Sequence, residues 1–414
     1  MGISPAVTEP TAKSSPSPAS TPVPPPPASG DDAEMLSQHG ARIHDSEFVP
    51  TGQFAGDDRT SSTSGSMSGS TAGVKVDGYD TFGRDELAKV LSYFDVGEIK
   101  KLDDFRRGSR KAPKLIFRSS RGRFLLKRRA KGTQDLEKVQ FCHAIQEALT
   151  DKQFPLPHLI PVTESGTTML LLDGNVYELF EFIPGQIYDQ SLEATYDAGR
   201  ILSTYHRLLE DFSSEHTPPT GSYHGAEAVE KGFDRVLRHL ARKPDIASVC
   251  RFLLDSYRHA RDSATDKGLD DWPKQVVHGD WHPGNMLFRQ KRVVAVIDYD
   301  SARVLPRIID AANGALQFSI LGGGPDLGKW PEHLDQSRFK RFLRGYDQVN
   351  LLSEAELTAT PWLMIEALIA EAVFPIAATG NFGKLEGGAF LDMVQRKVVW
   401  LQKESDRLID LVKN

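Results

Sequence analysis

The spacing of apolar residues divides this chain into a strand-rich N-terminal part and a helical C-terminal part. Apolar runs at 114–118 and 123–127 flank a Ser-Ser-Arg-Gly turn, which predicts an antiparallel hairpin. A second hairpin is predicted over 168–182, around Asp173-Gly174-Asn175. Over 193–212 the apolar positions recur every three or four residues, the pattern of a helix with one buried face. We therefore predict an α+β protein.

Helical spacing recurs over 83–94, 135–149, 226–241, 245–266, 308–320 and 335–349, and a strand with a charged face is expected at 97–105. Residues 1–75 are different, because they are rich in Pro, Ser, Thr, Gly and Ala and have almost no apolar periodicity. Such a segment buries too little surface to offset chain entropy, so we expect a disordered tail. With Pro184-Gly185 as a boundary, residues 76–183 form the strand-rich unit and 184–414 the helical unit.

The strongest chemical signal lies in the second half of the chain. Residues 278–285 read HGDWHPGN, and residues 297–300 read IDYD. They supply one carboxylate at Asp280, one carboxamide at Asn285 and a second carboxylate at Asp298. Kinase-type phosphoryl transfer uses one carboxylate to position the acceptor hydroxyl, and an amide and a carboxylate to hold Mg²⁺ on the nucleotide phosphates.

The surrounding pattern places these three groups close together. Short apolar runs at 274–278, 285–288 and 292–297 predict strands, and the Gly and Pro residues between the first two predict a loop. A hairpin formed by the last two strands would bring the three side chains within a few Å. Mg²⁺ prefers oxygen ligands, which Asn and Asp both provide.

These motifs resemble the aminoglycoside phosphotransferase and choline kinase family, which includes homoserine kinase type II-like and spore-coat kinase-like members. HGDWHPGN is similar to the family's H-x-D-x-x-x-x-N, and IDYD to its I-D-x-[DE], within a resemblance that covers roughly residues 85–410. It implies a bilobal protein kinase-like fold, with an antiparallel β-sheet N-lobe that binds nucleotide and a mostly helical C-lobe that holds the catalytic loop and the substrate cleft. It further implies ATP and Mg²⁺ as cofactors, Asp280 as the catalytic residue, and Asn285 and Asp298 as metal ligands.

The resemblance also assigns a nucleotide-binding cation and its carboxylate partner. Lys127 ends an apolar strand and corresponds to the family's residue that reaches the α- and β-phosphates. Arg128 is the fallback, although it points to the other face of the strand. The helix that follows has Cys142 where the family has a glutamate. Glu137 on the same helix is therefore assigned as the substitute partner of Lys127.

Two further segments are expected to contact the nucleotide. The basic loop over 106–113 includes Ser109, and either the neighbouring N–H groups approach the phosphates or the loop is a solvated charged turn. In the family, adenine binds main-chain groups of the linker after the last strand of the N-lobe. That linker corresponds here to Glu181, Phe182 and Ile183.

Other polar residues near the motifs are expected to support them. His278 is expected to hydrogen-bond the loop backbone, and Asp310 to cap a helix N-terminus and brace the loop. Asp300 is either a solvated charge at a strand end or a group that contacts or supports the substrate. His206 is interpreted as a packed or capping histidine. Glu366 and Glu371 are interpreted as charged edges of core helices, although in the family these helices face the cleft.

The net charge of −6 gives no basic surface typical of nucleic-acid binders. The expected partner is a small molecule with a hydroxyl group, of the amino sugar, amino alcohol or amino acid class. Two alternatives remain open. One is a catalytically weak kinase-like scaffold, favoured by Cys142 and by a Pro-rich tail that could recruit a protein. The other is a metal-dependent hydrolase that uses His278, Asp280 and His282.

The remaining sequence features concern location. The two cysteines, Cys142 and Cys250, give no disulfide framework and fit a reducing cytoplasm. No apolar run is judged long enough to span a membrane, and the N-terminus lacks the apolar region of a signal peptide. We therefore expect a cytoplasmic protein without membrane contact.

Overall fold

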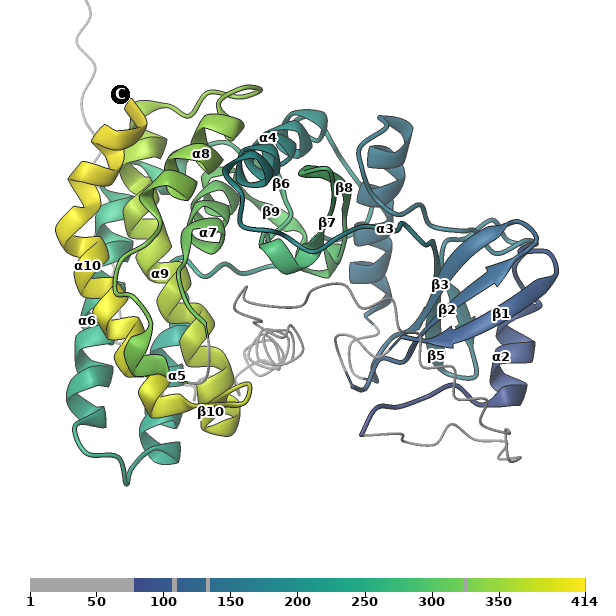
Figure 1. The fold of residues 1–414 in the computed structure, drawn as a ribbon, viewed down its shortest axis with the longest axis horizontal. Coiled ribbons are helices and arrows are strands. Elements are labelled where there is room, and N and C mark those ends of the chain that lie inside the picture. Colours follow the sequence, from purple (N-terminus) through teal and green to yellow (C-terminus); the bar gives the residue numbers. More distant parts are fainter. Residues whose placement is uncertain (1–77, 106–109, 132–134, 324–325, 414) are drawn as a thin grey trace, which may run out of the picture.

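The computed structural model describes residues 78–105, 110–131, 135–323 and 326–413. The predicted tail at 1–75 and Ser109 lie outside the described residues. Figure 1 shows a sheet at one end of the molecule and a group of long helices at the other end. This division agrees with the predicted order of strands and helices along the chain.

In the part of the chain that the structure describes, the sheet contains five antiparallel strands in the order β1-β2-β3-β5-β4. The strands are β1 (Ile99–Asp104), β2 (Lys114–Ser119), β3 (Gly122–Arg128), β4 (Leu170–Leu172) and β5 (Asn175–Glu181), and helix α2 (Arg84–Leu91) precedes them. Both predicted hairpins are confirmed, because β2 pairs with β3 and β4 pairs with β5. Leu87, Val90 and Leu91 of α2 share an apolar cluster with Phe117 and Leu126 of the sheet. Helix α2 therefore covers one face of the sheet.

Helix α3 (Leu136–Asp151) lies between the sheet and the helical part (Figure 1). Its N-cap is Asp135, whose side chain accepts a hydrogen bond from Lys138 N. The buried face of α3 includes Phe141 and Cys142, which belong to the large apolar cluster of the helical part. Cys142 and Cys250 are both buried, and neither forms a disulfide.

Within the described residues, seven long helices form the second part. They are α4 (Leu192–Leu208), α5 (Glu227–His239), α6 (Ile246–Thr265), α7 (Ile308–Ser319), α8 (Gln336–Tyr346), α9 (Glu354–Thr379) and α10 (Gly387–Lys413). Four short strands, β6 (Lys274–Val277), β7 (Met286–Arg289), β8 (Arg292–Val296) and β9 (Arg303–Pro306), lie between α6 and α7 in the chain. The small elements are η1 (Leu269–Asp271), η2 (Pro283–Asn285), η3 (Tyr299–Ser301), η4 (Leu327–Lys329), β10 (Asn381–Phe382) and β11 (Leu385–Glu386).

Helix α9 corrects one expectation about membranes. It has 26 residues, and its most apolar window has a mean hydropathy of 1.6, so by length and composition it could cross a membrane. The expectation that no segment reaches this length is wrong. However, 78% of that window is buried within the fold, where α9 packs against α5, α6, α7 and α10. The apolar composition of α9 therefore reflects its place as a core helix.

Helices α4 and α8 approach each other at two glycines. A Cβ atom at Gly345 would overlap the carbonyl oxygen of Tyr196, and one at Gly199 would overlap that of Phe342. We expect Gly345→Ala to lower the free energy of unfolding by about 1–3 kcal/mol, because the two backbones must separate. Urea denaturation measures this loss. Ser337→Ala, at an exposed position of α8, should leave the midpoint nearly unchanged, and an equal midpoint for Gly345→Ala would contradict the packing argument.

Candidate active site

The two sequence motifs lie on a compact arrangement of short strands. Strand β6 pairs with β9, and β7 pairs with β8 in the predicted hairpin. The N–H of Ile297 donates to the carbonyl oxygen of Asn285 at 2.9 Å, which extends the β7–β8 pairing by one residue at each strand. Asp298, the next residue in the chain, therefore emerges beside Asn285.

Asp280 and Asn285 are joined directly. Asn285 Nδ2 donates to Asp280 Oδ2 at 2.9 Å and to the Asp280 carbonyl oxygen at 3.0 Å. Since the amide nitrogen is engaged in this way, Oδ1 is the atom of Asn285 that remains for a further contact. The Asp280 side chain is 31% exposed. Its carboxylate is thus held by the loop and still accessible to a substrate.

Asp298 has the features of a metal ligand. Its backbone is left-handed, with φ 64° and ψ 69°, a conformation that Asp and Asn adopt more readily than most residues. The side chain is exposed and makes no hydrogen bond or ion pair with any residue that the structure describes. A carboxylate without a hydrogen bond, together with the side-chain oxygen Oδ1 of the neighbouring Asn285, fits a hard cation such as Mg²⁺.

Lys127 lies on β3 with two carboxylates beside it. Its Nζ is 3.5 Å from Glu178 Oε2 and 3.4 Å from Asp300 Oδ2. Burial lowers the pKa of Lys127, but Asp300 and Glu178 outweigh burial, so the pKa lies above its usual value. Asp300 is therefore not a solvated charge at a strand end. It belongs to the surroundings of Lys127.

The assignment of Glu137 as the partner of Lys127 is wrong. The Glu137 side chain is 61% exposed and lies 3.8 Å from His216 Nδ1. The carboxylate comes instead from Glu178 on β5, which stands directly opposite Lys127 in the pairing of β3 with β5. Residues opposite each other in an antiparallel pair have their side chains on the same face. Arg128 points to the other face, where it pairs with Glu86.

Asp310 and His278 support the loop, but not in the way expected. Asp310 accepts hydrogen bonds from His278 N at 2.6 Å and Gly279 N at 2.8 Å, so the predicted brace is present. The N-cap of α7 is Arg307, and Asp310 lies in the first turn of the helix. His206 is buried and packed, as expected, with Nε2 3.3 Å from Asp310 Oδ2.

The sequence interpretation expected the His278 ring to hydrogen-bond the loop backbone, and this expectation is wrong. Both ring nitrogens are buried without a hydrogen-bond partner in the described part of the chain. The ring lies among Tyr205, Trp281 and Tyr299. Burial lowers the pKa of His278, which favours the neutral ring. His278 thus supports the loop through its backbone N–H and through aromatic packing.

His282 faces the Asp280 carboxylate. Gly284 N donates to His282 Nδ1 at 3.0 Å, so the proton of the neutral ring is on Nε2, which lies 3.6 Å from Asp280 Oδ2. The rings of His278 and His282 therefore have different surroundings. No group of three or more His, Cys, Asp or Glu side chains among the described residues is arranged to hold a metal ion. This arrangement does not support the hydrolase alternative.

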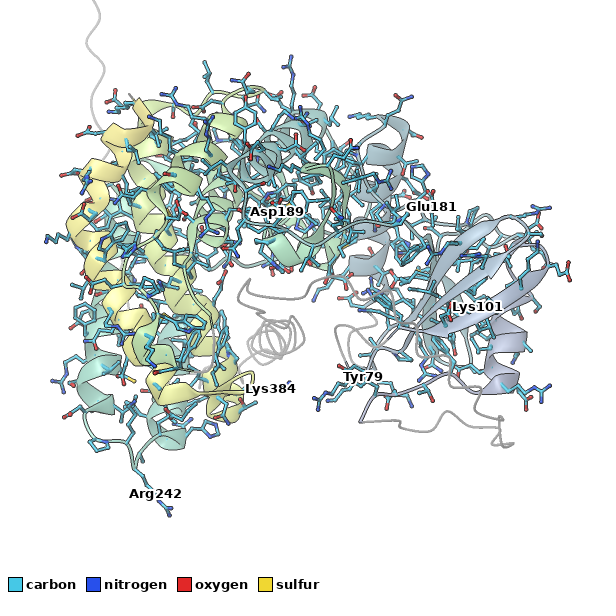
Figure 2. All side chains as sticks on the ribbon, viewed as in Figure 1. Tyr79, Lys101, Glu181, Asp189, Arg242 and Lys384 are labelled. Atoms are coloured by element: carbon cyan, nitrogen blue, oxygen red, sulfur yellow. The ribbon has the colours of Figure 1, made fainter. Side chains whose placement is uncertain are left out.

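The linker after β5 leaves one N–H group available. Glu181 N donates to His158 O and Phe182 N to Arg123 O, both at 2.9 Å. The N–H of Ile183 makes no hydrogen bond within the described ranges. Figure 2 shows Glu181 at the junction between the sheet and the helical part. A donor contact to an adenine ring would therefore come from Ile183.

Glu371 lies close to Asp280, although the sequence interpretation placed it at the charged edge of a core helix. Gln317 Nε2 donates to Glu371 Oε2 at 2.5 Å. Burial, and then the negative charge of Asp280, raises the pKa of Glu371 to about 7. Helical spacing alone had placed Glu371 at a charged edge of α9. The position of α9 relative to the catalytic loop is a tertiary feature that the spacing does not contain.

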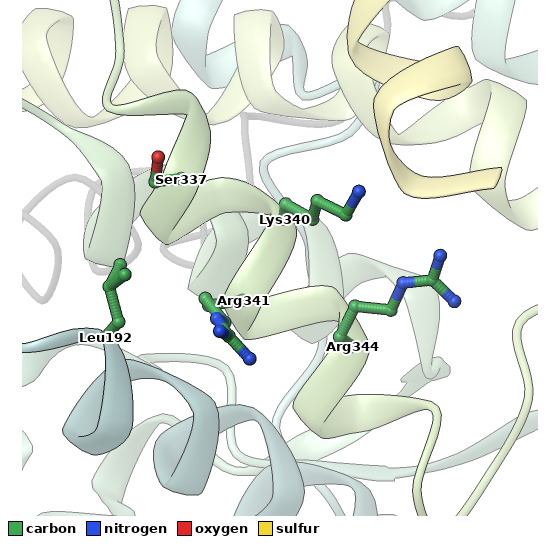
Figure 3. Close-up of a pocket in the computed structure, with 5 residues that line it drawn as sticks. All are labelled: Leu192, Ser337, Lys340, Arg341 and Arg344. Atoms are coloured by element: carbon green, nitrogen blue, oxygen red, sulfur yellow. The ribbon is translucent and has the colours of Figure 1, made fainter. Parts of the chain in front are cut away.

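An open hollow of about 470 Å³ lies elsewhere, between α4 and α8 (Figure 3). It is lined by Leu192, Ser337, Lys340, Arg341 and Arg344. None of these residues belongs to the two motifs. The candidate active site is therefore identified by the geometry around Asp280 and not by this hollow.

Comparisons with known proteins agree with the geometry. Residues 108–352 match the phosphotransferase enzyme family. A homoserine kinase from Phenylobacterium zucineum is 26% identical over 287 residues, which cover 67% of this chain and 80% of that protein.

Solved structures of low sequence identity show the same fold. A microcompartment-associated aminopropanol kinase has a TM-score of 0.57 at 12% identity and covers 78% of this chain and 97% of its own. The amicoumacin kinase hAmiN, solved with AMP-PNP and Ca²⁺, has a TM-score of 0.53 at 13% identity. The match covers 80% of this chain and 94% of that kinase. The predicted resemblance and the predicted bilobal, kinase-like α+β fold are confirmed.

Proposed function

The chain belongs to the phosphotransferase enzyme family, and we propose that it is an ATP-dependent kinase that transfers the γ-phosphate to a hydroxyl group of a small molecule. The observation that carries the proposal is the hydrogen bond from the Asn285 side chain to the Asp280 carboxylate, with Asp298 emerging beside Asn285. This geometry brings together a group to position an acceptor and two oxygen ligands for a cation.

Each residue of the site has a role in this proposal. Asp280 orients the acceptor hydroxyl and takes its proton, as a general base does. Asn285 Oδ1 and Asp298 would hold Mg²⁺, which supplies positive charge at the phosphates when bound. Lys127 adds a second positive charge from the N-lobe sheet, and Ile183 N–H supports adenine. The similarity to a kinase solved with AMP-PNP supports ATP as the donor.

We further propose that the acceptor carries an amino group, as amino sugars, amino alcohols and amino acids do. Glu371 lies close enough to Asp280 for the Asp280 charge to raise its pKa. A cation bound between these two carboxylates would relieve their repulsion. The names of the relatives, homoserine kinase and aminopropanol kinase, support the same class.

The pH dependence of substrate binding tests the role of Glu371. Its pKa is raised to about 7, so the carboxylate gains charge as the pH rises through that value. We expect the KM for an amine-bearing acceptor to fall by up to about tenfold between pH 6 and pH 8, because the ionised fraction rises about tenfold. Glu371→Gln should abolish this change. A neutral polyol acceptor serves as the control, and an identical pH profile in the Gln variant would contradict the assignment.

A substrate screen tests the proposed function itself. ADP release is measured with Mg²⁺-ATP across hydroxylated amines, amino acids and amino sugars, and the background without acceptor is subtracted. Acceptor-dependent ADP release supports the kinase. ATP binding without acceptor-dependent release of ADP would instead favour the scaffold alternative. The loss of the family glutamate at Cys142 no longer favours a scaffold, since Glu178 supplies a carboxylate to Lys127.

A cytoplasmic location is also part of this proposal. Cys142 and Cys250 are both buried thiols without a disulfide, as in proteins of a reducing compartment. A protein partner for the Pro-rich segment remains a proposal from the sequence, because that segment lies outside the described residues.

A further inference from the structure

A buried cation, Arg129, lies close to the half-buried Lys127. It comes directly after β3 and is 6% exposed. Arg129 N donates to Val176 O at 2.9 Å, so the pairing with β5 continues to this residue. Residues two positions apart along a strand point to the same face. Arg129 and Lys127 therefore face the same group of carboxylates.

Arg129 makes the shorter contacts with these carboxylates. Its Nη2 donates to Glu178 Oε1 at 2.8 Å and to Asp300 Oδ1 at 2.5 Å. Lys127 lies 3.5 Å from Glu178 and 3.4 Å from Asp300. Glu178 Oε2 is buried and accepts no hydrogen bond from any described residue. Arg129 thus holds both acids firmly, whereas Lys127 contacts them loosely.

Helix α3 completes the support of Glu178. His143 Nε2 lies 2.8 Å from Glu178 Oε1, and His143 Nδ1 lies 2.9 Å from Thr168 Oγ1. The helix therefore contributes a histidine next to the position where the family has its glutamate. In this chain the carboxylate comes from β5, the strand opposite Lys127, and His143 on α3 orients it.

The charges of the four central groups balance. Lys127 and Arg129 carry two positive charges, and Glu178 and Asp300 carry two negative charges. A buried carboxylate without a partner is costly. If Lys127 turns towards a phosphate, both carboxylates keep their bonds to Arg129. A guanidinium suits this task because it presents several donors in a fixed plane.

We propose that Arg129 is a positioning residue for phosphoryl transfer. It holds Glu178 on β5 and Asp300 in the C-lobe at the same time, which leaves Lys127 able to bind the nucleotide phosphates. Asp300 lies two residues after Asp298, so the same bonds fix the N-lobe sheet against the loop that carries this metal ligand. The inference rests on the proposed function and concerns residues that the sequence motifs do not include.

Three variants test this role. Arg129→Met removes the charge and keeps much of the length, Arg129→Lys restores a charge, and Arg128→Met is the matched control on the opposite face of the same strand. We expect Arg129→Met to raise the KM for Mg²⁺-ATP by about 10–100-fold, the effect of misplacing a reactive group. The KM for the acceptor should change little. Arg129→Lys should recover part of the loss, and Arg128→Met should match the wild type.

A double variant separates positioning from mere stability. Arg129→Met combined with Asp300→Asn should be no worse than Arg129→Met alone, because each change already removes the contact between Arg129 and Asp300. An unchanged KM for Mg²⁺-ATP in a folded Arg129→Met protein, or fully additive losses, would overturn the proposal. If circular dichroism shows that Arg129→Met does not fold, the Asp300→Asn variant is measured instead. We expect it to raise the KM for Mg²⁺-ATP. An unchanged KM would overturn the positioning role of Arg129.

If the wild-type protein shows no transfer activity, the proposed function is wrong, but the role of Arg129 can still be tested. The rise in melting temperature caused by Mg²⁺-ATP then replaces the kinetic measurement. That rise should be smaller in Arg129→Met than in Arg128→Met. Equal rises in the two variants would overturn the role of Arg129 independently of catalysis.

Discussion

Asp280→Asn is expected to lower kcat by about 10²–10⁴, the usual contribution of a general base, while the affinity for Mg²⁺-ATP stays close to that of the wild type. The carboxamide cannot take the hydroxyl proton. Its oxygen can still accept the hydrogen bond that Asn285 Nδ2 gives to Asp280 Oδ2. The loop should therefore keep its shape, and a change confined to kcat indicates an interaction specific to the chemical step.

The measurement combines acceptor-dependent ADP release with calorimetric titration of Mg²⁺-ATP. Asp255→Asn, which alters an exposed carboxylate on α6, is the control and should change neither quantity. If Asp280→Asn retains most of the wild-type kcat, Asp280 is not the catalytic residue. If nucleotide affinity also collapses, the variant has disturbed the loop and the role of Asp280 in the chemical step is contradicted.

Asp298→Asn is expected to weaken the binding of ATP in the presence of Mg²⁺ by at least about tenfold, equivalent to about 1.4 kcal/mol. Asp298 makes no hydrogen bond or ion pair with the residues described, so we expect the loss to report mainly on a cation that its carboxylate would bind. Asn is the better substitution than Ala, because φ is 64° at this position and Asn tolerates left-handed backbone.

Titration of ATP with and without Mg²⁺ measures this effect. The wild type should show a large gain in affinity on adding Mg²⁺, and Asp298→Asn should show little gain. Asp280→Asn is the comparison, since it should keep the gain while losing transfer. Normal Mg²⁺-dependent affinity in Asp298→Asn would show that the metal assignment is wrong.

Features set by local sequence were predicted well. The turn residues at 173–175 determine one hairpin, and the periodicity of the long helices determines their existence with ends that shift by a few residues. The contact between Asn285 and Asp280 could also be predicted, because only the four residues of a Gly- and Pro-containing loop separate them. Asp298 follows from the β7–β8 hairpin, whose strands are close in sequence.

Features set by tertiary packing were not predicted. Glu178 stands opposite Lys127 because β3 pairs with β5 in one particular register, and the segment between the two strands contains α3 and β4. Glu137 was chosen by its distance along α3, whereas the rotation of the helix directs it outwards to His216. The His278 ring was expected to meet backbone, but three aromatic residues from separate segments enclose it. A sequence pattern does not contain these relations.

The burial of Cys142 and Cys250 has a practical consequence. Thiol reagents should leave both native cysteines of the folded protein largely unmodified, so neither needs to be replaced before labelling. Cysteines introduced at Lys101 on the sheet and at Arg242 in the helical part, both exposed (Figure 2), would accept a pair of fluorophores. Energy transfer between the dyes would then follow any change in the separation of the two lobes when nucleotide is added.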